Sequence, residues 1–276
     1  MLVEVLSAHP HALLARSETA IEDQWRRVRA HRRAVADLRA HHVLTRRWWQ
    51  VGRWLRQRRE LRELLALEPR VDPGLLIRRE RQRHGVRAEE LVTAALERLG
   101  DDWLLFRGYA NRRGEVDHLL VGPGGVWAIE VKSRGVVVHV HDDRWTFEKF
   151  DRYGNLVESG WLRDGGGRSW GRQVSDVAGE LQRFLRSRSL DVVVRPAVAV
   201  VHERAELGEF HSARDVLLSI GADYLVNHVE RQPALLDGWT RDRIAALVRR
   251  DHRFHEDRRG DGAAGSRRRR LVRPPS

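Results

Sequence analysis

An alternation of apolar and polar residues with a period of two runs from Trp103 to Phe150 and constrains the fold more than any other feature of the sequence. Such alternation is typical of half-buried strands, whereas the segments before Trp103 repeat their apolar residues with the helical period. Turn-forming clusters divide the stretch into five expected strands, at 103–110, 115–121, 126–133, 136–140 and 145–150. The pattern therefore predicts an antiparallel meander.

Helical periods flank this sheet on both sides. The helix before it is expected to end at Gly100 and to have one apolar face, made of Val92, Ala95, Leu96 and Leu99. Glu89 falls on that face and Glu90 does not. After the sheet, a glycine-rich loop at 153–168 leads to an amphipathic helix with Val174, Val177, Leu181 and Leu185 on its buried face.

An apolar strand is expected at 192–201, where Pro196 indicates a sheet edge or a bulge. A last helix is expected near Thr240. Residues 20–70 have the pattern of two arginine-rich helices with a break near 41–42, and Asp72-Pro73 is typical of a helix start. We therefore expect a basic helical hairpin at 1–71, a second domain at 72–256 and a disordered basic tail at 257–276.

The charge balance favours a nucleic-acid partner. Lysine and arginine number 51 against 39 acidic residues, a formal net charge of +12. The expected phosphate contacts are Arg46, Arg47, Arg53 and Arg56 in the second arm helix, and Arg267 and Arg268 in the tail. Two alternatives stay open for the arm, a merely solvated basic face and a helix lying on an anionic membrane surface.

Several classes of protein are excluded or disfavoured. The sequence contains no cysteine, which excludes disulfides, cysteine-ligated metals and thiol nucleophiles. No apolar run approaches the length of a membrane span and the first twenty residues do not resemble a secretory signal, so we expect no integral membrane association and a cytoplasmic location.

The segment Gly122-Pro-Gly-Gly125 is the candidate turn of a hairpin that carries charged residues. If the turn is centred between residues 123 and 124, residues whose numbers sum to 247 face each other, and Asp117 is directly opposite Glu130. Their Cβ atoms would lie about 4.5–5.5 Å apart, with Lys132 on the same face of the sheet. Two opposed carboxylates need compensation from a shared proton, a cation or a divalent metal.

Oxygen ligands select Mg²⁺ or Mn²⁺ over zinc, so Asp117 and Glu130 are candidate metal ligands. Lys132 is one of only two lysines in a chain that otherwise uses arginine. A lysine can assist an attacking water and stabilise charge on phosphorus, whereas arginine stays protonated. The alternative is an ordinary surface cluster of ion pairs.

The stretch from Gly114 to Ser133, with Asp117 followed by Glu130-Val-Lys132, resembles the nuclease-related domain family of the PD-(D/E)xK nuclease superfamily. Residues 88–96 resemble the first helix of that family, and the resemblance covers roughly residues 80–250. It implies an α/β, restriction-endonuclease-like αβββαβ core with a mixed sheet flanked by helices, here preceded by the α-helical arm. It also implies roles for Lys132 as the lysine of the ExK signature, for Glu89 as the first-helix acid and for Gln173 at the start of the second helix.

The resulting hypothesis is a metal-dependent nuclease that hydrolyses phosphodiester bonds of nucleic acid, with DNA favoured over RNA. Asp117 and Glu130 would bind the metal, and Lys132, Glu89 and Gln173 would serve the reaction. One alternative is a non-catalytic nucleic-acid-binding module on the same fold. Another is an interaction protein whose tryptophan-rich hairpin docks a partner or an anionic membrane.

Overall fold

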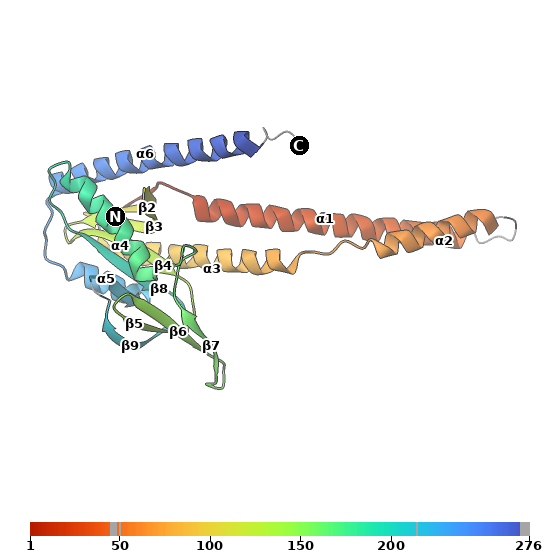
Figure 1. Cartoon of the computed structure of the whole chain (residues 1–276), viewed down its shortest axis with the longest axis horizontal. Helices are drawn as coiled ribbons and strands as arrows, with labels where there is room; N and C mark the ends of the chain where they lie inside the picture. Colours follow the sequence, from red (N-terminus) through yellow and green to blue (C-terminus); the bar gives the residue numbers. More distant parts are fainter. Residues whose placement is uncertain (45–48, 50, 214, 271–276) are drawn as a thin grey trace. The chain divides into compact units, whose positions relative to one another are not determined.

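The computed structural model describes residues 1–44, 49, 51–213 and 215–270 (Figure 1). The chain forms two compact units. One unit consists of Met1–His9 together with the chain from Gly85 onward, and the other consists of Pro10–His84. The described residues contain no helix that is both long and apolar enough to cross a membrane.

The smaller unit is helical. It contains most of α1 (His9–Leu44), α2 (Val51–Ala66) and the first half of α3 (Pro73–Leu96). Helix α1 buries Ile21, Val28 and Val35, which are spaced by seven residues and so lie on one face of the helix. The first helix continues to Leu44, beyond the expected break at 41–42, and α2 buries none of its residues.

The start and end of the helix before the sheet agree with the capping pattern. The Gly74 amide donates to Asp72 Oδ1 at 2.8 Å, and α3 begins at Pro73. It passes into the short 3₁₀ helix η2 (Glu97–Leu99), and the chain turns at Gly100 with a φ of 85°. The unit boundary nevertheless lies inside α3, between His84 and Gly85, and not after residue 71.

The larger unit is built on a six-stranded mixed sheet in the order β1-β2-β3-β4-β8-β10. Its strands are β1 (Leu2–Val5), β2 (Leu104–Asn111), β3 (Gly114–Gly122), β4 (Gly125–Lys132), β8 (Val194–Val200) and β10 (Leu217–Ile220). Strands β2, β3 and β4 are antiparallel, whereas β1, β8 and β10 pair in parallel with their neighbours. The first residues of the chain therefore belong to this sheet, and assigning them to the arm was wrong.

Helices cover both faces of the main sheet. Residues of α4 (Trp170–Arg186) and α6 (Gly238–Arg270) share one apolar core with the strands. The second half of α3 and α5 (Ala222–Glu230) share a second core on the opposite face. The order α3-β2-β3-β4-α4-β8 is the expected αβββαβ core, so the α/β fold class is confirmed.

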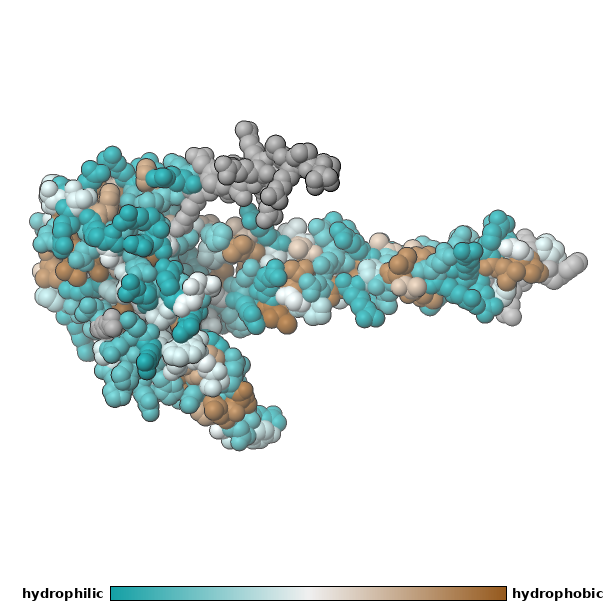
Figure 2. All heavy atoms as spheres, viewed as in Figure 1, coloured by the Kyte–Doolittle hydropathy of each residue, from teal (hydrophilic) through white to brown (hydrophobic). Residues whose placement is uncertain are grey.

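The expected five-stranded meander is wrong after its third strand. Residues of the fourth and fifth expected strands join a second sheet in the order β7-β6-β5-β9. Its strands are β5 (Val137–His141), β6 (Arg144–Phe150), β7 (Leu156–Trp161) and β9 (Glu206–Ser212). Strand β8 instead pairs with the free edge of β4, so that β4 lies between β3 and β8 in the interior of the main sheet. Figure 2 shows apolar side chains near the free end of the β6–β7 hairpin, where Leu156 and Val157 are exposed.

Two further expectations need correction. β8 lies inside the sheet although it contains Pro196; β10 pairs with it only from Ala197 onward, so the proline stands where one side of β8 is still without a neighbour. The chain from residue 257 onward, expected to be disordered, continues α6 as helical backbone to Arg270. An arginine-rich segment needs no apolar face to extend a helix that already exists.

Candidate active site

The hairpin between β3 and β4 has the expected register. Leu119 pairs with Ala128 and Val121 with Val126, so the paired numbers sum to 247 up to the Gly122–Gly125 turn. Position 125 requires a positive φ, of 112°, which glycine adopts more readily than any other residue. The composition of the turn thus sets which strand residues share a face.

The paired part of the hairpin ends at His118 and Ile129, one residue before the expected carboxylate pair. Contrary to the prediction, Asp117 is therefore not paired directly opposite Glu130. Its Oδ2 atom instead accepts a hydrogen bond of 2.6 Å from the Val131 amide across the hairpin. Beyond His118 and Ile129, polar side chains take the place of the backbone ladder.

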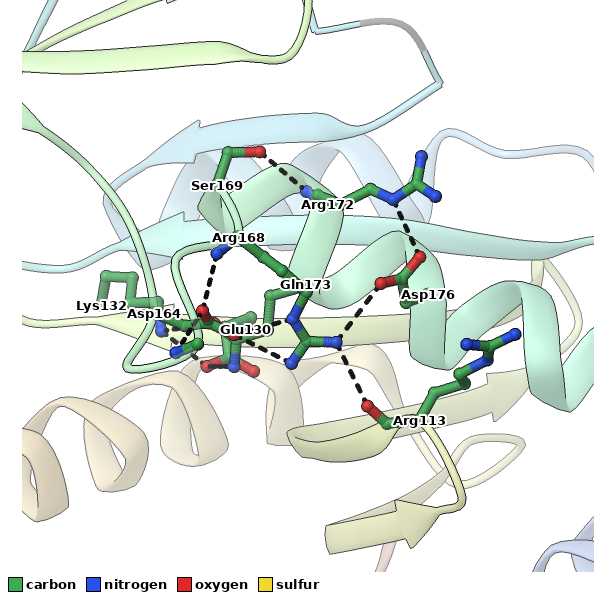
Figure 3. Close-up of polar contacts among 10 residues, drawn as sticks. Arg113, Glu130, Lys132, Asp164, Arg168, Ser169, Arg172, Gln173 and Asp176 are labelled. Carbon is green, nitrogen blue, oxygen red and sulfur yellow. Dashed lines mark hydrogen bonds and ion pairs between the residues drawn. The ribbon is translucent and has the colours of Figure 1, made fainter.

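Glu130, Lys132 and Gln173 form a closed triangle of hydrogen bonds (Figure 3). Lys132 Nζ donates to Glu130 Oε1 at 2.7 Å and to Gln173 Oε1 at 3.2 Å. Gln173 Nε2 donates to the same Glu130 oxygen at 2.7 Å. The amide of Gln173 thus bridges the carboxylate and the ammonium group, and all three predicted residues meet at one point.

The second oxygen of Glu130 has a different environment from the first. Glu130 is only 5% exposed, and its Oε2 atom is buried without a hydrogen-bond partner among the described residues. An unpaired buried carboxylate oxygen is costly. Together with Asp117 it offers the hard oxygen donors that Mg²⁺ prefers.

These donors fit a metal that is bound by few protein groups. Within the described part of the chain, no three His, Asp or Glu side chains gather closely enough to hold a metal by themselves. Mg²⁺ commonly binds through one or two carboxylates, with water and substrate phosphate as the remaining ligands. Asp117 and Glu130 match that second pattern.

Negative charges accumulate around the triangle and perturb two carboxyl groups. Burial raises the pKa of Glu89 from 4.5 to about 7; the positive charge of Arg107 opposes this shift, and the negative charge of Glu130 adds to it. Burial also raises the pKa of Asp117 well above its usual value, with further contributions from Glu130 and Glu89. Perturbed carboxyls of this kind are typical of catalytic clefts.

The loop before α4 places Gln173. Ser169 caps the helix, its side chain accepting from the Arg172 amide at 3.2 Å. Asp164 Oδ1 accepts from the amides of Gly166 and Arg168, each at 2.9 Å. The Arg168 guanidinium in turn binds Asp164 and Asp176, as Figure 3 shows. The first turn of α4 is therefore held at both sides, which orients Gln173 toward β4.

Two features of the site were not predicted. Trp170 is buried, and the Lys132 ammonium lies 5.6 Å from the centre of its ring, a cation–π contact. Thr93 Oγ1 donates to the Glu89 carbonyl at 2.9 Å and lies 2.8 Å from Nε2 of the buried His118. Trp170 stands three residues before Gln173, so helical spacing could have indicated that the two side chains lie on the same face of the helix. The Thr93–His118 contact joins segments that are distant in the sequence, and no local pattern predicts it.

The arginines expected to contact phosphates are only partly described. Arg53 and Arg56 are exposed on α2. Arg46 and Arg47 lie outside the described residues. Arg267 and Arg268 lie on the backbone of α6, but their side chains are not described.

Residues 84–201 match the family model of the nuclease-related domain. The matched segment runs from the second half of α3 through β8 and contains Glu89, Asp117, Glu130, Lys132 and Gln173. No curated protein and no solved structure gives a significant match to the chain.

Proposed function

We propose that this chain, whose residues 84–201 match the family model of the nuclease-related domain, hydrolyses phosphodiester bonds of nucleic acid, with DNA as substrate, in the presence of Mg²⁺ or Mn²⁺. The observation that carries the proposal is the closed triangle of Glu130, Lys132 and Gln173 beside Asp117. A carboxylate with one unpartnered buried oxygen, an adjacent ammonium and a second carboxylate suit phosphoryl chemistry.

Each residue has a distinct role in this proposal. Asp117 and Glu130 would hold the metal, which when bound would polarise the scissile phosphate and make a bound water more acidic. Lys132 would move from Glu130 toward the phosphate and stabilise the charge that develops on its oxygens. Gln173 is a positioning residue, because its amide fixes both Glu130 and Lys132.

Glu89 suits a proton-transfer role. Its pKa of about 7 lets its carboxyl exchange protons near neutral pH, where an ordinary glutamate is always ionised. The side chain lies on the same apolar-facing side of α3 as buried Ala88 and Val92, while Glu90 is exposed. The partial burial that raises the pKa therefore follows from its place on the helix.

A cleavage assay on single- and double-stranded DNA and RNA, with Mg²⁺, Mn²⁺ or EDTA, tests the proposal. We expect metal-dependent cutting of DNA that Glu130→Gln and Lys132→Met abolish. Glu158→Gln and Lys149→Met are matched controls, because this half-exposed pair lies in the second sheet and should not affect cutting. Cutting that survives Glu130→Gln would contradict the proposed site.

One observation favours a second candidate, a nucleic-acid-binding module that does not cut. Lys132 Nζ lies 2.7 Å from Glu130 Oε1, so a cation already balances the negative charge of this carboxylate. A module of this kind would bind nucleic acid equally well in Mg²⁺ and in EDTA, and Glu130→Gln would leave its affinity unchanged. The same assay panel, read for binding, separates the two candidates.

A further inference from the structure

A groove lies between α4 and α6, away from the carboxylate–lysine site. Its volume is about 580 Å³, which falls in the range of roughly 300–1,000 Å³ that small-molecule sites occupy. Both helices cover the same face of the main sheet (Figure 1). The groove therefore belongs wholly to the larger unit.

The walls of the groove are cationic and aromatic. Arginines line it from both helices, from the turn after α4 and from the β2–β3 turn: Arg112, Arg183, Arg188, Arg250 and Arg258. Among the described side chains, the carboxylates that accompany them are Glu180 and Asp251. Phe184 and Phe254 supply apolar surface, and Phe254 is 54% exposed.

Both carboxylates are already engaged. Glu180 pairs with Arg112 at 2.5 Å and with Arg183 at 2.6 Å. Asp251 accepts a hydrogen bond of 2.5 Å from the buried Tyr109 hydroxyl, which ties α6 to β2. Among the described residues, neither carboxylate forms an ion pair with Arg188, Arg250 or Arg258.

Arg188, Arg250 and Arg258 are therefore the cations available to a ligand. None of the three forms an ion pair with a carboxylate in the described part of the chain. The Arg188 guanidinium lies 5.6 Å from the centre of the Phe184 ring, and that of Arg258 lies 5.4 Å from the Phe254 ring. Guanidinium groups paired with aromatic rings, in a cationic groove, are the recognition elements of single-stranded nucleic acid.

We propose that this groove binds a nucleotide unit of single-stranded nucleic acid, with its phosphate on Arg188, Arg250 and Arg258 and its base against Phe254. The binding is independent of cleavage and goes beyond the proposed function. Glu180 follows Gln173 by two turns of α4, about 10 Å along the helix axis. A strand in the groove is thus held by the same helix that places Gln173.

The test measures binding of a fluorescein-labelled hexathymidylate by the full chain in EDTA, so that no cutting intervenes. We expect Phe254→Ala to weaken binding about five- to a hundredfold, the loss of one stacked base. Arg250→Ala should lower the slope of log affinity against log salt by about 0.7, the value for one phosphate contact on a single strand. Both side chains are exposed, so the fold should persist, as the thermal melt will show.

Matched controls exist on the same unit. Phe210→Ala removes an aromatic ring of similar exposure from β9, and Arg186→Ala removes an α4 arginine that pairs with Asp191 outside the groove. Equal affinities for the groove variants and these controls would overturn the proposal. Binding of adenosine monophosphate without binding of the oligonucleotide would also overturn it. A third contrary result would be a polyglutamate peptide that displaces the oligonucleotide from the groove and whose own affinity does not change in Phe254→Ala.

Discussion

Gln173 donates its side-chain amide to Glu130 Oε1 at 2.7 Å, although 43 residues separate them in the sequence. The contact joins the first turn of α4 to the end of β4. It places a neutral, rotationally restrained group beside the Glu130–Lys132 ion pair, so that the carboxylate and the ammonium group keep a defined orientation.

Replacing this amide should lower turnover more than stability. In Gln173→Ala we expect kcat for cleavage to fall about 10- to 100-fold with little change in KM, because Glu130 and Lys132 lose their bridge. Gln182→Ala is the control, since Gln182 lies on the same helix and binds the Val194 amide at 3.0 Å. It should lower the melting temperature and leave kcat unchanged; equal kcat losses in the two variants would refute a positioning role for Gln173.

The raised pKa of Glu89 predicts a pH-dependent stability difference. Its folded-state pKa of about 7 exceeds the ordinary 4.5, so the folded protein holds a proton that the unfolded chain has lost. The contribution of Glu89 to stability therefore falls as pH rises from about 4.5 through 7.

Glu89→Gln removes this effect. Without divalent metal, the stability of the variant relative to the original protein should rise by roughly 1–3 kcal/mol between pH 5 and pH 8. Urea unfolding at both pH values measures it. The exposed Glu97 offers the control, because Glu97→Gln removes a surface carboxylate outside this cluster and should give a constant difference. A constant difference for Glu89→Gln as well would argue against a raised pKa.

Metal binding and cutting should separate in one variant. Asp117→Asn and Glu130→Gln should each weaken Mn²⁺ binding by about tenfold or more, because a carboxylate ligand is lost. Lys132→Met should bind Mn²⁺ at least as tightly as the original protein, because it removes a cation that lies 2.7 Å from the other oxygen of the Glu130 carboxylate, yet it should not cut. Calorimetric titration with Mn²⁺ decides this; loss of binding in Lys132→Met would contradict the assigned roles.

Gly108 tests the place of the N-terminal strand in the main sheet. Its φ is 71°, and a Cβ atom there would lie 2.7 Å from the Ser7 carbonyl oxygen, just after β1. Gly100 also has a positive φ, of 85°, but open space around it. We expect Gly100→Ala to cost about 1 kcal/mol and Gly108→Ala about 2–4 kcal/mol in unfolding experiments. Equal costs would mean that β1 does not pack there.

The exposed arginines of α2 should add affinity without sequence preference. Replacing both Arg53 and Arg56 with alanine should reduce the slope of log affinity against log salt for duplex DNA by about 2, close to the value for two phosphate contacts. Replacing Arg59, which pairs with Glu63 at 2.9 Å, should change it less. An unchanged slope in the double variant would mean that Arg53 and Arg56 do not contact phosphates and that this face of α2 is merely solvated.

Local patterns were enough for the β3–β4 hairpin and for the core order α3-β2-β3-β4-α4-β8. The register that sums to 247 follows from the turn at 122–125, because turn chemistry and the pleat act between near neighbours. The face of α3 that carries Glu89 follows from helical spacing, and so do the start at Pro73 and the stop at Gly100. The predicted pairing of Asp117 with Glu130 is not observed, because the backbone ladder between β3 and β4 ends one residue earlier, at His118 and Ile129.

Other features depend on partners that are distant in sequence. The fourth expected strand leaves the meander because β8, more than sixty residues later, takes the edge of β4. β1 joins the sheet through β2, about a hundred residues away. The pKa of Glu89 and the unpartnered oxygen of Glu130 arise from burial, which no local pattern contains. Short-range sterics and periodicity act along the chain, whereas strand neighbours, desolvation and site geometry exist only once remote segments have packed together.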